Sequence, residues 1–222
     1  MRLFALLLAL LPIGHSVDGR AIRPVTLGDP AAPHRVLVVG CIHGNEPAGN
    51  AIVRRLISTG APAGTEIVAL TSVNPDGCRR GTRQNAHGVD LNRNFPSNWA
   101  RIGREGSYQY SGPHPLSEPE SRYAVALVGR VRPQITIWFH QPQGVVRAWG
   151  QSVPTARRFA ALAGFPYRSI EWPFGTAANW QNHRFPGTAS FVVELPPGPV
   201  PPNRVSRWAN AIRRLAVEGY RR

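Results

Sequence analysis

The first third of the chain alternates between short apolar runs and one segment with helical periodicity. Apolar, β-branched runs at 35–41 and 65–72 have the length and composition of buried strands. Between them, apolar residues recur at helical spacing over 46–58, and Pro47 suits the first turn of a helix. This strand–helix–strand order predicts an α/β sheet.

The remainder divides into a long segment without periodicity and a second series of regular elements. Residues 74–115 are dense in Gly, Asn, Pro and Arg, and an irregular segment of this length inside a compact domain usually carries function. Beyond it the pattern predicts a helix that starts with a capping box at 117–120, a strand at 134–140, a helix at 154–163, a strand at 188–195 and a final helix at 203–218. We expect one α/β domain.

Composition supports a single folded domain and argues against nucleic-acid binding. The chain has 222 residues, 42% of them hydrophobic, and a net charge of +14. All 26 basic residues are Arg, a skew typical of GC-rich coding, and they are scattered along the chain. A nucleic-acid interface would need them gathered into one stripe or patch. The charge instead favours contact with an anionic surface such as a bacterial cell wall.

The N-terminus has the pattern of a signal segment. Arg2 precedes an apolar run from Leu3 to Leu11, which is too short to span a bilayer as a helix. We therefore expect a signal segment at 1–13, a folded domain at 14–222 and export to the periplasm, cell wall or medium. The alternative is that these residues form a first strand or follow a misplaced start codon, which would leave the protein in the cytoplasm.

Two cysteines, Cys41 and Cys78, make up the whole cysteine content. In an exported protein such a pair permits one disulfide. Their spacing fits no cysteine-based zinc site. The sequence leaves both the paired and the free forms open.

Three residues could together bind a metal ion. His43 and Glu46 lie three apart directly after the first apolar run, and His140 ends the run at 134–140. Ligands gather at the carboxyl ends of strands in α/β sheets, and imidazole and carboxylate groups suit Zn²⁺. Three such ligands leave a fourth position for water, as in catalytic zinc sites. The alternatives are a surface His with a helix-start Glu, and a core His bonded to backbone.

Glu194 is unusual because it ends the apolar run at 188–195. A carboxylate is costly to bury without a partner. Beside an activated water it could accept a proton and pass it to a leaving amine. The alternative is a Glu at the strand end that faces solvent.

The order of motifs along the chain resembles the zinc metallocarboxypeptidase family. The motifs are His43-x-x-Glu46, Asn-Pro-Asp-Gly at 74–77, Arg83-x-Asn85, Gly-Val-Asp-Leu-Asn-Arg-Asn-Phe at 88–95, His140 and Glu194. The block at 88–95 is long and specific, and the resemblance runs from about residue 14 to residue 216. It implies a single-domain, mixed but mostly parallel twisted sheet with helices on both faces, and an opening strand at 14–22.

The resemblance also implies the metal and the groups that act beside it. It makes His43, Glu46 and His140 the ligands of one Zn²⁺ ion. It makes Glu194 the general base and acid, and Arg83 the group that polarises the scissile carbonyl and steadies the oxyanion.

Three further roles follow from the block at 88–95. The resemblance implies that Asn92 and Arg93 grip a free carboxylate of the substrate, which suits the forked guanidinium of Arg. It also implies that Asp90 orients the imidazole of His43 from behind. Asn74 and Asp76 are expected to hold the loop rather than to touch substrate.

Additional blocks at 110–121, 139–142 and 185–196 resemble the bacterial murein peptide amidases of this family. That resemblance implies hydrolysis of the γ-D-glutamyl–diaminopimelate bond of peptidoglycan-derived peptides. The alternatives are a general metallocarboxypeptidase, an N-acetylmuramoyl-L-alanine amidase and, more distantly, a non-catalytic module that binds the cell wall. Tyr167, Trp172 and Trp180 are candidates for a substrate wall, with core packing as the alternative.

Overall fold

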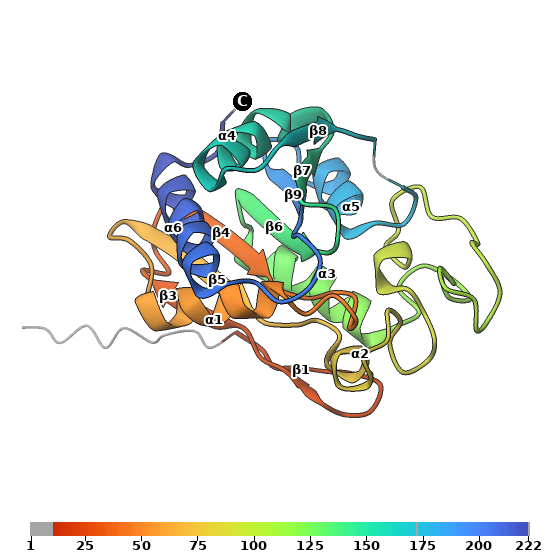
Figure 1. Cartoon of the computed structure of the whole chain (residues 1–222). Coiled ribbons are helices and arrows are strands. Elements are labelled where there is room, and N and C mark those ends of the chain that lie inside the picture. The colour runs from red at the N-terminus through yellow and green to blue at the C-terminus, as the bar shows by residue number, and fades with distance from the viewer. Residues whose placement is uncertain (1–10, 172, 222) are drawn as a thin grey trace, which may run out of the picture.

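The computed structural model describes residues 11–171 and 173–221 of the chain. At its centre lies a seven-stranded sheet, which runs through the middle of the molecule in Figure 1. The strands follow one another across the sheet in the order β3 (Val25–Gly28), β5 (Thr65–Leu70), β4 (His34–Val39), β6 (Ile135–His140), β9 (Ala189–Glu194), β7 (Val145–Ala148) and β8 (Tyr167–Ser169).

The central strands β5, β4, β6 and β9 run parallel. They are almost wholly buried, as expected for parallel strands covered on both faces. At one edge β3 pairs antiparallel with β5, and at the other β7 pairs antiparallel with β9 and parallel with β8. The expected mixed, mostly parallel sheet is therefore confirmed.

Helices cover both faces of this sheet (Figure 1). On one side lie α1 (Gly49–Thr59), α4 (Val153–Ala163) and α6 (Pro202–Glu218), and α6 packs against both of the others. On the other side lie α3 (Pro119–Val131) and α5 (Ala177–Arg184).

The alternation of side chains along β6 and β9 shows the two layers directly. Phe191 packs against Phe159 of α4, whereas Trp138 lies on the opposite face and meets Phe95, which in turn contacts Trp180 of α5. The site described below lies at the carboxyl ends of these same strands.

Several predicted boundaries change in the structure. The expected opening strand at 14–22 is a hairpin of two short strands, β1 (Gly14–His15) and β2 (Ala21–Ile22). The segment 74–115 is not wholly irregular, because α2 (Pro75–Arg80) and a 3-10 turn at Leu91–Arg93 lie within it. These elements are too short to show periodicity in the sequence.

The capping box expected at 117–120 does not form. Helix α3 starts at Pro119 with Glu118 as its N-cap residue, and no side chain caps it. The hydroxyl of Ser117 instead donates to the Glu118 carboxylate at 2.7 Å. Pro119 suits the first helical position, and this moves the helix start one residue beyond the predicted cap.

The expected signal segment at 1–13 lies mostly outside the described residues. Of the part that is described, Leu11 packs against the core, and the hydroxyl of Tyr123 donates to the carbonyl of Pro12 at 2.8 Å. Among the described helices, none has the length and apolar character needed to cross a membrane.

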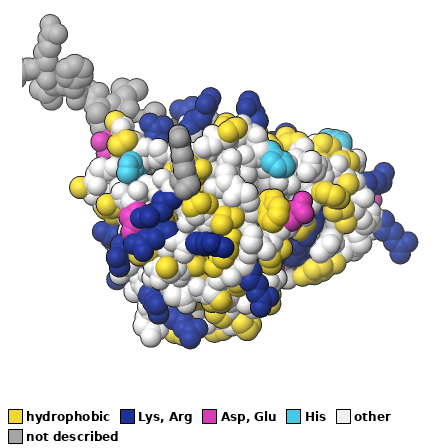
Figure 2. Space-filling view, turned by 90° about the horizontal axis from the view of Figure 1, so that it is seen from above, with side chains coloured by type: hydrophobic (Ala, Val, Ile, Leu, Met, Phe, Trp, Pro, Cys, Tyr) yellow, Lys and Arg dark blue, Asp and Glu magenta, His cyan; other side chains and the backbone are white. Residues whose placement is uncertain are grey.

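The basic side chains form several separate groups on the face shown in Figure 2, with apolar and uncharged surface between them. On that face the arginines do not gather into one continuous basic stripe.

Candidate metal centre and active site

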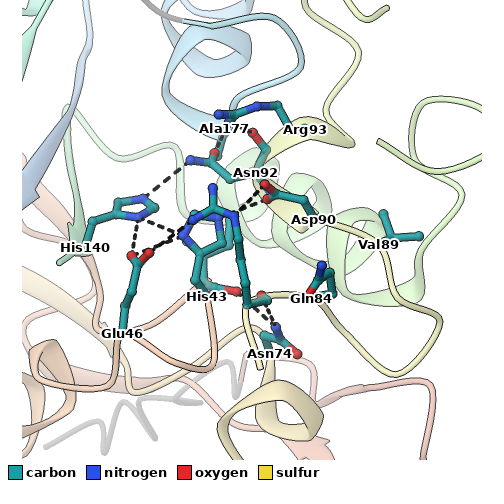
Figure 3. A network of polar contacts seen from close by, with 12 residues as sticks. His43, Glu46, Asn74, Gln84, Val89, Asp90, Asn92, Arg93, His140 and Ala177 are labelled. Atoms are coloured by element: carbon teal, nitrogen blue, oxygen red, sulfur yellow. Dashed lines mark hydrogen bonds and ion pairs between the residues drawn. The ribbon is translucent and has the colours of Figure 1, made fainter. Parts of the chain in front are cut away.

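His43, Glu46 and His140 meet at the carboxyl ends of β4 and β6 (Figure 3). The Nδ1 atoms of the two histidines lie 3.1 Å apart, and each is close to Oε2 of Glu46, at 3.1 Å for His43 and 2.9 Å for His140. All three residues are buried. The structure thus brings together the three predicted ligands with one donor atom each.

The donor set fits Zn²⁺. In a tetrahedron with bonds of about 2.0–2.1 Å, neighbouring ligand atoms lie roughly 3.3 Å apart, close to the separations found here. Two neutral ring nitrogens and a carboxylate oxygen facing one another this closely are stabilised by a cation between them. His43, Glu46 and His140 are therefore the residues that would hold the ion.

Asp90 fixes the ring of His43 from the side away from the other ligands. Its Oδ1 lies 3.0 Å from Nε2 of His43, so Nε2–H can donate to the carboxylate and leave the Nδ1 lone pair for a metal. Oδ2 of Asp90 accepts from Nε of Arg83 at 2.8 Å. Nη1 of Arg83 donates to Oε1 of Glu46 at 3.1 Å. Arg83 thus ties the Asp90 carboxylate to the carboxylate of Glu46.

These charges shift the pKa values of the carboxylates. Burial alone would raise the pKa of Glu46, but contacts with His140 and His43 outweigh it and hold this pKa well below its usual range. Asp90 behaves in the same way: burial opposes ionisation, but its interactions with His43 and Arg83 keep its pKa far below normal. Both groups are therefore ionised at neutral pH, as metal ligation and its support require.

Asn92 and Arg93 line the same pocket from the 3-10 turn. Oδ1 of Asn92 accepts from the backbone N–H of Ala177 at 3.0 Å, which ties the turn to the start of α5. Nη1 of Arg93 donates to the carbonyl of Asn92 at 2.7 Å. Burial lowers the pKa of Arg93, and the nearby guanidinium groups of Arg83 and Arg147 lower it further.

Glu194 stands beside His140, because the two residues are register partners at the ends of β9 and β6. Its side chain is buried, yet Oε2 has no hydrogen-bond partner among the described residues. Oε1 lies 3.7 Å from Nη1 of Arg147. A buried carboxylate with one unpaired oxygen that lines a pocket beside a metal site is suited to proton transfer.

The pocket that contains these groups has a volume of about 1020 Å³. This is at the upper end of the range for sites that bind small molecules or short peptides. It is lined by the predicted metal ligands, by Arg83, Asn92, Arg93 and Glu194, and by a Pro-rich segment at 197–200. The structure brings seven of the eight predicted site residues to one pocket and places the eighth, Asp90, directly behind it.

Asn74 holds the backbone that carries two of these side chains. Its Nδ2 donates to the carbonyl of Ile42 at 3.1 Å and to that of Arg83 at 3.4 Å, and its Oδ1 caps α2 through the N–H of Gly77. Nearby, a Cβ placed on Gly44 would overlap the backbone of Gly77. The turn after β4 and the start of α2 are therefore in direct backbone contact.

Some residues of the site were not singled out from the sequence. The backbone N–H of Gln141 donates to Oε2 of Glu46 at 3.2 Å, and its Oε1 accepts from the N–H of Ala48 at 3.2 Å. Tyr108 lines the pocket, with the guanidinium of Arg83 lying 5.0 Å from its ring. A signal for Gln141 was its position directly after the strand-end His, whereas nothing local distinguished Tyr108.

Two of the three aromatic residues proposed as a substrate wall, Trp180 and Tyr167, do not take that place. Trp180 packs between Phe95 and Phe185 in the core, and Tyr167 of β8 lies beside Arg157. Neither lines the pocket. Trp172 lies outside the described residues.

A family model described as zinc carboxypeptidase matches residues 4–183. The chain belongs to the zinc carboxypeptidase family. Murein peptide amidase A of Vibrio campbellii, a curated relative, is 31% identical over 183 residues, covering 73% of this chain and 70% of that protein. Murein peptide amidase A of Escherichia coli K12 is 35% identical over 121 residues, which span 48% of each protein. The matched part is thus about half the length of that relative.

Solved structures of the family agree in fold. The murein-tripeptide amidase of Escherichia coli O157 has a TM-score of 0.71 at 26% identity, with 94% of this chain and 93% of that chain covered. Carboxypeptidase A of Helicoverpa armigera has a TM-score of 0.78 at 18% identity, with 94% and 69% covered, and shows the fold alone. Family membership confirms the prediction of a zinc metallopeptidase and the resemblance on which it rested.

Proposed function

We propose that this protein hydrolyses a peptide amide bond next to a free carboxylate, and that the bond is the γ-D-glutamyl–diaminopimelate bond of murein peptides. The observation that carries the reaction class is the convergence of His43, Glu46 and His140 with Glu194 in one pocket. The similarity to murein peptide amidases supports the substrate.

His43, Glu46 and His140 would hold one zinc ion. Bound zinc lowers the pKa of a water molecule and polarises a carbonyl group. The Glu194 carboxylate then accepts the proton of the attacking water at Oε2, which is free of other partners among the described residues, and donates it to the leaving nitrogen. The closeness of Glu194 to His140 supports this role.

Arg83, Asn92 and Arg93 supply the positive and polar groups of the pocket. Two nitrogens of Arg83 are engaged by carboxylates, and Nη2 makes no hydrogen bond within the described part of the chain. We assign Nη2 to the oxygen of the scissile carbonyl, where negative charge develops. The guanidinium of Arg93, together with Asn92, is assigned to the free carboxylate of the substrate.

The experiment that tests this proposal compares substrates with and without chelator. Purified protein is incubated with L-Ala-γ-D-Glu-diaminopimelate, with ordinary peptides that have free C-termini, and with muramoyl peptides. We expect chelator-sensitive release of diaminopimelate from the first. Cleavage of ordinary peptides alone would identify a general carboxypeptidase, and release of L-Ala peptides from muramic acid would identify an N-acetylmuramoyl-L-alanine amidase. Wall binding without release from any substrate would support a non-catalytic module.

We also propose that the protein is exported and works at or near the cell wall. The apolar run at 3–11 after Arg2, the net charge of +14 and a murein substrate all support this location. Fractionation of cells that express the full chain tests it. Recovery of the unprocessed chain in the cytoplasm alone would instead support the cytoplasmic alternative.

A further inference from the structure

Arg147 lines the pocket but has no role in the proposed reaction. Arg147 lies on β7, where it pairs with Val192 of β9. Directly opposed residues of an antiparallel pair share one face of the sheet, and residues two apart on a strand share it as well. Arg147, Val192 and Glu194 therefore face the same side, and all three line the pocket.

The position of Arg147 places it beyond Glu194 as seen from the metal ligands. His140 lies on β6, Glu194 on the adjacent strand β9, and Arg147 on β7, the next strand across. Along the strands Arg147 lies level with Val192, which is two residues, or about 7 Å, back along β9 from Glu194. A group bound there would belong to the part of the substrate that extends away from the scissile bond.

Arg147 is poorly paired for an arginine in this environment. Its side chain is 18% exposed, and its buried Nε has no hydrogen-bond partner among the described residues. The nearest carboxylate oxygen, Oε1 of Glu194, is 3.7 Å from Nη1, which is beyond a good hydrogen bond. Burying a guanidinium without full pairing is costly, so its donors are available for an anionic ligand.

Arg93 is a second arginine of the pocket whose positive charge is incompletely paired. It forms no ion pair with any carboxylate in the described residues, and it is close enough to Arg147 for that guanidinium to lower the pKa of Arg93. Two neighbouring guanidinium groups, both in the pocket and both short of carboxylates, match a ligand part that carries two anionic groups. One carboxylate beside the scissile amide accounts for Arg93 alone.

We propose that Arg147 binds a second carboxylate on the leaving amino acid, and so selects substrates whose leaving group is a dicarboxylic amino acid such as diaminopimelate. This inference rests on the proposed function for the orientation of the substrate. Lysine is diaminopimelate without its distal carboxylate, which makes the two a matched pair of leaving groups.

The test compares L-Ala-γ-D-Glu-diaminopimelate with L-Ala-γ-D-Glu-Lys in the wild-type protein and in Arg147→Met, which keeps an apolar stem and removes the charge. We expect the wild type to prefer the diaminopimelate peptide in kcat/KM by roughly 10- to 100-fold, the range for a hydrogen-bonded charge. In Arg147→Met this preference should disappear, mainly through a higher KM for the diaminopimelate peptide. Arg130→Met, an exposed site on α3, serves as the control that removes the same charge.

An alternative role for Arg147 is to hold Glu194. In that case Arg147→Met would lower kcat for both peptides by the same factor and leave their ratio intact, which would overturn the proposal. If the wild type cleaves neither peptide, the proposed function is wrong, and this result does not test the role of Arg147. In that case calorimetry still tests the role of Arg147, by measuring the affinities of the protein for free diaminopimelate and for free lysine. Equal affinities, or a preference for diaminopimelate that survives in Arg147→Met, would rule out the second carboxylate site.

Discussion

His140 and Glu194 are direct neighbours across β6 and β9, each at the carboxyl end of its strand. Adjacent strands lie about 4.8 Å apart, so the backbone itself places a carboxylate beside a candidate metal ligand. No loop has to close to bring them together. The pairing of these two strands fixes where the Glu194 carboxylate stands relative to the candidate metal ligand His140.

Replacing Glu194 should separate metal binding from turnover. We expect Glu194→Gln to bind one zinc ion with nearly unchanged affinity, because Glu194 is not among the three converging ligands. Its kcat should fall by about 10²–10⁴-fold, the usual contribution of general acid–base catalysis. Metal content and steady-state kinetics measure the two effects. Glu105→Gln, in an exposed loop, is the matched control, and full activity in Glu194→Gln would remove this residue from its proposed role.

Replacing Asp90 should weaken zinc binding without removing a ligand. Asp90→Asn keeps the size of the side chain but loses the charge that orients the Nε2–H of His43. Loss of such a partner typically lowers metal affinity by about 10–100-fold. Competition with a chelator of known affinity measures the change. Unchanged zinc affinity would show that His43 is oriented without Asp90.

Asp76 should stabilise the fold in a pH-dependent way. It is buried and accepts hydrogen bonds from the hydroxyl of Ser16, the N–H of Asp18 and the guanidinium of Arg20, which together anchor the β1–β2 hairpin to α2. Burial alone would raise the pKa of Asp76, but these contacts outweigh it and lower the pKa below its ordinary value of 3.8. The stabilisation is therefore complete above that ordinary value and is lost as the pH falls through the lower, folded-state pKa.

We expect Asp76→Asn to lower the free energy of unfolding by about 1–3 kcal/mol at pH 7, the cost of weakening a buried hydrogen-bond network. The difference from the wild type should shrink as the pH falls through the lowered folded-state pKa of Asp76, where Asp76 itself becomes protonated. Urea unfolding across this pH range measures it. A difference that stays constant with pH would show that the ionised carboxylate contributes nothing.

Cys41 and Cys78 should be oxidised if the protein is exported. Their sulfur atoms lie 2.8 Å apart as free thiols, so little movement separates them from a bond. In an oxidising compartment a disulfide oxidant can remove two electrons and two protons from the pair. Thiol titration of the unfolded protein, purified from the exported fraction without reductant, should then find none of the two thiols free. Two free thiols in that fraction would contradict the expectation.

The hydrogen bond with Cys41 also holds the pKa of Cys78 below its ordinary value, at about 7. Since the thiolate is the reactive form, Cys78 of the reduced protein should react with iodoacetamide near neutral pH. The buried Cys41 has a raised pKa, because of its hydrogen bond to Cys78 and its burial, and should remain unmodified under the same conditions. Peptide mass mapping distinguishes the two sites.

The sequence predicted that His43, Glu46 and His140 would lie together, because the two histidines sit at strand ends. His43 and His140 each follow a buried apolar run, and that position is visible in the chain before any tertiary contact is known. Parallel strands then bring their carboxyl ends to one edge of the sheet. The same reasoning located Glu194.

Other parts of the site depend on contacts that a linear pattern does not show. Strand β7 is only four residues long, so its sequence shows no periodicity. The proposed role of Arg147 depends on the antiparallel pairing of β7 with β9, some 45 residues later in the chain. The bond between Asn92 and Ala177 likewise joins the 3-10 turn to a helix that has almost no apolar face of its own. These features come from packing between distant segments.

The contact between Gly44 and the start of α2 has a consequence for how such an enzyme can diversify. Backbone meets backbone there, and even a methyl group on Gly44 would displace the turn that carries His43 and Glu46. On the other side of the pocket, Arg147 approaches the site with its side chain, 3.7 Å from Glu194, and a side chain can be replaced without displacing backbone. In a saturation library, variants with a new substrate preference should therefore come from that side, while substitutions at Gly44 abolish zinc binding and turnover together.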